Sequence, residues 1–167
     1  VSSGNQKKYS TNIYEAVQIN DLIFNGANNI SKIGFNHNMK TIIKNVNSDS
    51  KNSAKLKEKQ QSEVLSMFTY DIDLPLTKDN ANFNNQLIPK MSLRYSPNDT
   101  KNLKTEERYL NTDNIFSLNR IGYNETIESG TSITFGLDYE KKNKKDKNIF
   151  LGSKIATVFR DEINENL

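Results

Sequence analysis

The alternation of side chains in Gly130–Glu140 constrains the fold of this chain more than any other feature of its sequence. One parity carries Thr131, Ile133, Phe135, Leu137 and Tyr139, and the other carries Gly130, Ser132, Thr134, Gly136, Asp138 and Glu140. A period of two is typical of a β-strand whose two faces meet different surroundings. The preceding residues, Asp113–Glu128, lack this alternation and mix polar with aromatic side chains, so we predict a structured loop there.

The same period of two recurs in weaker form along the chain. The predicted strands are Tyr9–Ile19, Lys32–Lys44, Glu63–Leu74, Leu87–Tyr95, Thr131–Tyr139 and Ile149–Phe159. Polar connections are predicted at Val46–Gln61, Thr77–Asn85, Pro97–Asn111 and Glu140–Asn148, with a marginal helix around Ala54–Gln61 and a bulge or late strand start at Pro89. The prediction is an all-β, antiparallel meander of about six or seven strands.

The length of these strands points to a membrane. Several run for roughly 10–13 residues, longer than the ~5–6 usual in soluble sheets and close to the ~9–11 of a tilted membrane-spanning strand. Only 34% of the residues are hydrophobic, which suffices if each strand has one apolar face. The sequence therefore favours a segment of a membrane β-barrel. A soluble β-sandwich or adhesin module, which would bury the same parity against a second sheet, is the alternative.

The alternation also assigns the two faces of the predicted wall. We expect Ile133, Phe135, Leu137 and Tyr139 to face lipid. The polar parity would face a water-filled lumen, and its predicted members are Ser132, Thr134, Asp138, Asp71, Asp73 and Arg94. These residues carry both signs of charge, which suits a hydrophilic barrel interior.

Catalytic chemistry finds little support in the sequence. His37 is the only histidine and there is no cysteine, so a Ser–His nucleophile, a zinc site or a disulfide framework is not expected. Asp71 and Asp73 share a strand face and could bind a cation, although a plain polar face is the commoner interpretation. No glycine-rich phosphate loop is present. We predict no catalytic, cofactor or metal residues, and a chain that is not an enzyme.

The charge distribution argues against nucleic acid as a partner. The net charge is only +3, and the basic residues do not gather on one face with aromatic side chains between them. The densest basic run comprises Lys141, Lys142, Lys144, Lys145 and Lys147. This run is either a solvated loop or a contact with anionic lipid phosphates.

A group of short motifs resembles a known family. The run Asn114–Arg120, then Gly122 and Glu128, is followed by a Gly-Leu-Asp-Tyr strand at Gly136–Tyr139 and by Gly152 and Arg160. In this order the motifs resemble the barrel domain of the LPS-assembly outer-membrane protein family LptD, also called the organic-solvent-tolerance family. The resemblance covers about Leu87–Arg160. The residues that carry it are Asn114, Phe116, Ser117, Asn119, Arg120, Gly122, Glu128, Gly136, Tyr139, Gly152 and Arg160.

The resemblance implies a location and a role. Residues 1–167 would be part of one outer-membrane β-barrel domain, too short to close and without the family's periplasmic domain. The protein would lie in the outer membrane of a Gram-negative bacterium, in contact with outer-membrane lipid. It would take lipopolysaccharide from a periplasmic bridge component (LptA-like), work with a plug lipoprotein (LptE-like), and assemble lipopolysaccharide into the outer leaflet. A different outer-membrane barrel, a porin or an uptake receptor, is the alternative.

Overall fold

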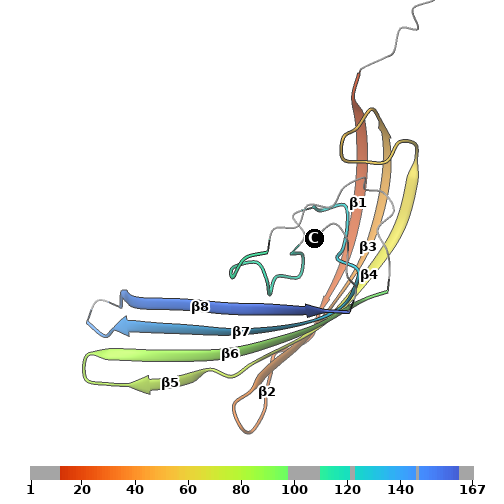
Figure 1. The fold of residues 1–167 in the computed structure, drawn as a ribbon. Coiled ribbons are helices and arrows are strands. Elements are labelled where there is room, and N and C mark those ends of the chain that lie inside the picture. Colours follow the sequence, from red (N-terminus) through yellow and green to blue (C-terminus); the bar gives the residue numbers. More distant parts are fainter. Residues whose placement is uncertain (1–11, 98–109, 121–122, 146, 162–167) are drawn as a thin grey trace, which may run out of the picture.

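The computed structural model describes residues 12–97, 110–120, 123–145 and 147–161, and these form one antiparallel sheet (Figure 1). The sheet has eight strands: β1 (Tyr14–Asn25), β2 (Asn29–Ile30), β3 (Asn36–Lys51), β4 (Gln61–Asp73), β5 (Leu76–Asp79), β6 (Phe83–Ser96), β7 (Gly130–Asn143) and β8 (Ile149–Arg160). The predicted all-β class is confirmed. The count exceeds six or seven because β2 and β5 are short strands of two and four residues beside the six long ones.

The order of the sheet is that of a meander. The long strands lie in the order β1-β3-β4-β6-β7-β8, while β2 pairs only with β3 and β5 only with β6. Long strands that follow one another along the chain are therefore neighbours in the sheet, and each pair is antiparallel. Ile133 of β7, for example, pairs with Leu93 of β6 on one side and Phe159 of β8 on the other. The predicted antiparallel meander is confirmed.

The prediction of a loop over Val46–Gln61 is wrong in its first third. Strand β3 continues to Lys51, and the connection to β4 spans only residues 52–60, which contain no helix. The polar run can be a strand because β1 and β4 pair with it on both sides, as at Val46, which lies opposite Ile19 and Glu63. Pairing of this kind outweighs intrinsic β-propensity. Asn52 and Lys59, both with positive φ, turn the chain at either end of the connection.

Other boundaries also differ from those predicted, and β3 begins at Asn36 rather than Lys32. Strand β1 extends through Asp21–Phe24, and its predicted start at Tyr9 lies outside the described residues. The predicted turn at Thr77–Asn85 contains β5 and the start of β6, joined by residues 80–82. Strand β7 continues to Asn143, so the turn before β8 is residues 144–148. The predicted loop at Pro97–Asn111 lies largely outside the described residues.

Pro89 lies inside a continuous strand rather than at a bulge or a late start. Its carbonyl oxygen accepts a hydrogen bond from the Leu74 backbone N–H at 3.1 Å. Here the neighbouring strand is itself interrupted, because β4 ends at Asp73 and β5 begins at Leu76, with Pro75 between them. The missing N–H of Pro89 therefore lies where the ladder to the neighbouring strand is already interrupted.

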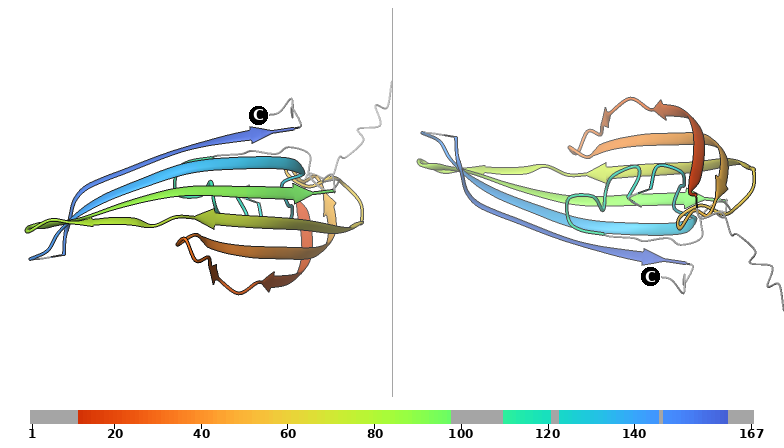
Figure 2. Two further views of the ribbon diagram at one scale, coloured as in Figure 1. Left: turned by 90° about the horizontal axis from the view of Figure 1, so that it is seen from below. Right: turned by 90° about the horizontal axis from the view of Figure 1, so that it is seen from above.

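The sheet is strongly curved, and its two faces differ in character. Figures 1 and 2 show it bent around residues 110–120 and 123–129, which lie on its concave face. The convex face exposes large apolar side chains: Leu22, Ile43, Phe68, Leu93, Tyr95, Phe135, Leu137, Ile155 and Phe159. Within the described residues no second sheet covers this face. No helix in the described part of the chain is long and apolar enough to cross a membrane.

Candidate functional site

Residues 110–120 and 123–129, here called the docked segment, form the candidate site together with the strand residues beneath them. The segment packs on the concave face through a small apolar cluster. Ile127 lies against Ile42, Leu65 and Met67, all less than 10% exposed, and Leu118 packs beside them. Burying apolar side chains between segment and sheet favours the docked position. The segment is thus a fixed part of the concave face in this structure.

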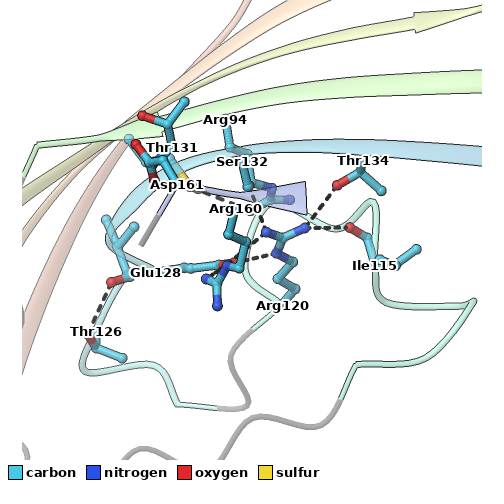
Figure 3. Close-up of polar contacts among 12 residues, drawn as sticks. Arg94, Ile115, Arg120, Thr126, Glu128, Thr131, Ser132, Thr134, Arg160 and Asp161 are labelled. Atoms are coloured by element: carbon cyan, nitrogen blue, oxygen red, sulfur yellow. Dashed lines mark hydrogen bonds and ion pairs between the residues drawn. The ribbon is translucent and has the colours of Figure 1, made fainter. Parts of the chain in front are cut away.

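Arg120 is the central polar anchor of the docked segment (Figure 3). Its side chain is fully buried, and it donates hydrogen bonds to Glu128 within the segment and to two strand hydroxyls. The bond to the Ser132 hydroxyl is 2.8 Å long and the bond to the Thr134 hydroxyl is 3.0 Å long. Both hydroxyls belong to β7 and are themselves buried. Because a buried guanidinium is stable only when its donors are satisfied, Arg120 joins the segment to β7.

Glu128 lies between two arginines. Its carboxylate accepts bonds from Nε and Nη2 of Arg120 and also pairs with Arg160 at the end of β8. Glu128 is 6% exposed, so this ion pair is largely screened from water. Such a pair costs desolvation energy to form, but removal of one partner leaves the other buried and uncompensated. The three residues therefore connect the segment to both β7 and β8.

Arg94 holds the other side of the segment from β6. Its guanidinium donates to the backbone oxygens of Ser117 and Leu118, the latter at 2.9 Å. It also contacts the sulfur of Met67 at 3.5 Å. A charged donor satisfying backbone carbonyls is a stronger tether than a neutral one. Arg94 thus fixes the main chain of the segment rather than only a side chain.

Phe116 lies directly on the backbone of β7 at Gly136. A Cβ atom at Gly136 would be 2.6 Å from two carbons of the Phe116 ring. Only glycine allows so close an approach. Lys90 extends over the same ring, with its Nζ 5.9 Å from the ring centroid, and forms an ion pair with Asp138.

Two further ion pairs attach the ends of the docked segment to the sheet. Asp113 accepts a hydrogen bond from Lys154 of β8 at 2.6 Å, at an exposed position. Glu125 pairs with Lys55 of the β3–β4 connection at 2.7 Å, and the Lys55 Nζ lies 4.7 Å from the centroid of the Tyr123 ring. The segment is therefore anchored to elements on opposite sides of the concave face.

The structure brings six of the family-motif residues together. Phe116, Ser117, Arg120, Glu128, Gly136 and Arg160 all take part in the contacts between segment and sheet. Asn114 and Asn119 instead bond within the segment, to the backbone of Asn111 and Tyr123. Tyr139 and Gly152 lie elsewhere: the Tyr139 hydroxyl bonds Asn85 at 3.1 Å, and Gly152 pairs with Glu140. Gly122 is outside the described residues.

The six residues predicted to face a lumen all lie on the concave face, but in two groups. Ser132, Thr134 and Arg94 are buried beneath the docked segment. Asp71, Asp73 and Asp138 lie beyond it and have polar partners on neighbouring strands. Asp71 pairs with Lys40 at 3.0 Å and accepts from Ser92 at 2.6 Å, while Asp73 accepts from Asn36 at 2.8 Å.

A polar hollow of about 520 Å³ occupies the end of the concave face near the β1–β3 turn. Asn36, Asn38, Lys40, Asp71 and Asp73 are among its lining residues. Across the described residues, no group of three or more His, Cys, Asp or Glu is placed to hold a metal ion. The arrangement as a whole presents a fixed polar surface of mixed charge.

Several residues of the site had no role in the sequence-based prediction. Lys55 was assigned to a polar connection with a marginal helix around Ala54–Gln61, and the apolar residues Ile42, Leu65 and Met67 fit no predicted face. A signal was present, since Leu65 and Met67 interrupt the alternation of their strand by placing apolar groups on its polar parity. Such exceptions indicate that something apolar covers that part of the face.

The comparison with known proteins agrees with the motifs that the segment contains. Residues 37–163 match the family model LptD, described as LPS transport system D. This range includes β3 apart from Asn36, β4 through β8, and the docked segment. No curated protein matches the chain. Because the match spans most of its length, the chain belongs to the LptD family, a family of lipopolysaccharide transport proteins.

Proposed function

We propose that this chain forms part of the wall of an outer-membrane β-barrel that assembles lipopolysaccharide into the outer leaflet. The observation that carries the proposal is the difference between the two faces of one continuous sheet. The convex face exposes large apolar side chains, whereas the concave face is polar and carries the docked segment. In this role the chain is structural, not catalytic.

The apolar side chains of the convex face would be stable in contact with lipid. Phe135, Leu137 and Ile155 are 41%, 38% and 67% exposed on adjacent strands. Moving such apolar surface from water into lipid is favourable by about 25 cal/mol per Å². The six long strands have 12 to 16 residues, enough to cross a bilayer, which needs ~9–11 residues per tilted strand. A soluble sandwich would need a second sheet over this face.

The two edges of the sheet support membership in a larger barrel. In the described residues β1 pairs only with β3, and β8 pairs only with β7. An unpaired backbone edge within lipid costs several kcal/mol for each unsatisfied group, so barrels in membranes are closed. We therefore assign residues 1–167 to one part of a single barrel domain, with further strands on both edges.

The concave face would then line the lumen of the barrel. The residues that the sequence assigned to the lumen lie on this face. Its polar groups of both signs, Asp71, Asp73, Lys40 and Lys90 among them, suit a path for the sugars and phosphates of lipopolysaccharide. The proposed partners are lipopolysaccharide, a plug lipoprotein of the translocon (LptE-like) and a periplasmic bridge component (LptA-like). The family supplies the transport role.

Photo-crosslinking in the whole barrel protein tests this assignment. Ala156 and Thr157 are neighbours on β8 but lie on opposite faces, Ala156 beside Gly136 and Thr157 beside Phe135. Each would be replaced by a photoreactive amino acid, and the cells given a pulse of labelled lipopolysaccharide precursor. We expect an early adduct at Ala156 that disappears during the chase. An adduct at Thr157 should be late and persistent, because it would report lipopolysaccharide already in the membrane.

Two results would contradict the proposal. If an intact barrel gives no adduct at Ala156, this part of the wall does not line the transport route. If the order of the two adducts is reversed, the assignment of lumen and lipid faces is wrong. Thr134 is a poor probe position because it is fully buried beneath the docked segment.

A further inference from the structure

One end of the sheet combines aromatic rings with a concentration of lysines. The β5–β6 and β7–β8 turns lie side by side there (Figures 1 and 2) and are joined by a hydrogen bond from the Lys144 N–H to the Asn82 oxygen at 3.0 Å. The rings of Phe83 and Phe150 meet with centroids 5.3 Å apart. Lys141 lies over both, with its Nζ 4.2 Å from the Phe83 centroid and 5.1 Å from the Phe150 centroid.

This end has more basic than acidic groups in the described part of the chain. Lys142 pairs with Glu140 at 2.7 Å, and Lys144 lies 3.6 Å from Asp79. Among the described residues Lys141 has no carboxylate partner, and the side chains of Lys78, Lys145 and Lys147 are exposed without one. Their positive charge is therefore available to an external anion.

The position of Lys141 relative to the apolar face identifies the kind of anion. Lys141 shares its parity on β7 with Leu137 and Tyr139, and it pairs with Leu151 of β8 and Asn85 of β6. The cation and its two rings thus follow directly after the convex apolar face, at the end of the strands. Aromatic rings and lysines at this depth lie at the membrane–water interface, where lipid phosphates are found.

The connections at the two ends of the sheet favour one leaflet. At this end residues 80–82 and 144–148 make short turns, whereas at the opposite end residues 97–129 join β6 to β7. Outer-membrane barrels place short turns on the periplasmic side and long loops outside. The lipids at the short-turn end are then glycerophospholipids of the periplasmic leaflet.

We propose that Lys141, Phe83 and Phe150, with the lysines of the adjoining turns, bind the phosphate headgroups of anionic phospholipids. The inference rests on the proposed membrane-spanning role of the sheet. The rings hold the Lys141 stem and its charge at the depth of the phosphates through cation–π contact. Lys78, Lys145 and Lys147 add to the local positive potential, which attracts anionic over zwitterionic lipid.

Fluorescence quenching by brominated lipids tests the proposal in the whole barrel protein. Phe150→Trp supplies a reporter that keeps the cation–π partner of Lys141, and its signal is isolated by difference from the parent protein. The protein is reconstituted into vesicles in which brominated phosphatidylglycerol or brominated phosphatidylcholine replaces the unlabelled lipid. We expect tighter binding of the anionic lipid at this position, and a loss of about five-fold of that preference in Lys141→Gln. Lys57→Gln, exposed on the connection at the opposite end of the sheet, should leave the preference unchanged.

The remaining outcomes separate failure of this inference from failure of the proposed function. If neither brominated lipid quenches the reporter, the convex face is not in lipid and the proposed function itself is wrong. Equal quenching by the two lipids, or a preference that survives Lys141→Gln, would overturn the headgroup site and leave the membrane role intact. If added lipopolysaccharide displaces the brominated phosphatidylglycerol more readily than unlabelled phosphatidylglycerol does, the occupant is not a phospholipid.

Discussion

Phe116 and Gly136 are in van der Waals contact across the boundary between the docked segment and strand β7, with no room for a Cβ atom between them. The two residues belong to separate motifs of the sequence, one in an irregular segment and one in a regular strand. Their contact explains why a glycine stands in the middle of a long strand, where it is otherwise unfavourable. It also means that the position of the segment depends on the backbone of β7.

We therefore expect Gly136→Ala to displace the docked segment. The new methyl group would lie 2.6 Å from the ring of Phe116, and overpacking of this kind costs about 1–3 kcal/mol. The chain contains no cysteine, so Thr126→Cys, at a fully buried position, provides a thiol whose maleimide labelling reports undocking. The labelling rate of residue 126 in the folded barrel should rise several-fold in Gly136→Ala.

Gly152→Ala is the matched control for this substitution. Its Cβ would meet its nearest neighbour, a methyl carbon of Ile149, at an ordinary 3.7 Å. Labelling at residue 126 should stay at the parent rate. An equal increase in both variants would show that any added methyl group in the sheet has this effect, and that the contact with Phe116 has no special role.

Arg120→Met is expected to be one of the most damaging substitutions in the segment. It removes the guanidinium but keeps most of the buried volume, leaving Glu128 with Arg160 as its remaining ion-pair partner. Breaking a buried pair costs about 3–5 kcal/mol when the partner is left alone, so with Arg160 still paired to Glu128 we expect a loss of at most this size. Urea unfolding of the detergent-folded barrel, read together with labelling at residue 126, measures the loss.

The exposed ion pair of the same segment provides the comparison. Lys154→Met breaks the contact with Asp113, where both side chains are largely exposed, and exposed ion pairs contribute little to stability because water screens them. If Lys154→Met is as damaging as Arg120→Met, burial does not determine the strength of these anchors.

Glu128→Gln combined with Arg120→Met should cost less than the sum of the two single changes, because each removes the same interaction.

Ile127→Ala tests the apolar part of the docking contact. Ile127 packs on Ile42, Leu65 and Met67 and is 4% exposed. Truncation to alanine should cost about 2–5 kcal/mol, and Ile127→Val only about 0.5–1.5 kcal/mol. A graded rise in the labelling of residue 126, small for valine and larger for alanine, is the expected result. Equal labelling in the parent and both variants would mean that the polar anchors alone hold the segment.

The sequence predicted the faces of the sheet well because, with a period of two, the face of one residue determines the face of every other residue in its strand. A shift of one residue would move every side chain of β7 to the other face, and Ser132, Thr134 and Asp138 do lie on the concave face. The polar strand at Val46–Lys51 was missed because its pairing with β1 and β4 is not encoded in its own composition.

The docked segment was harder to predict than the strands. The motif residues Arg120, Glu128 and Arg160 were singled out by family resemblance, but nothing in their spacing indicates that they form one buried ion cluster. Docking depends on contacts between residues far apart in the chain, such as Ile127 with Leu65. Only the misplaced apolar residues of β4 hinted that part of the polar face is covered.

The assignment of the convex face to lipid predicts how a charge will be tolerated there. Phe135→Lys should cost about 2–4 kcal/mol if the residue lies near the bilayer midplane. Ile88→Lys is the matched change on the concave face, since Ile88 is also apolar and lies opposite Asp138 in the β6–β7 pair, where a lysine would have a carboxylate nearby. The yield of folded barrel in the outer membrane, measured by its altered mobility in unheated gels, should fall for Phe135→Lys and change little for Ile88→Lys. If the two variants fold equally well, or if Ile88→Lys is the worse of them, the convex face does not contact lipid.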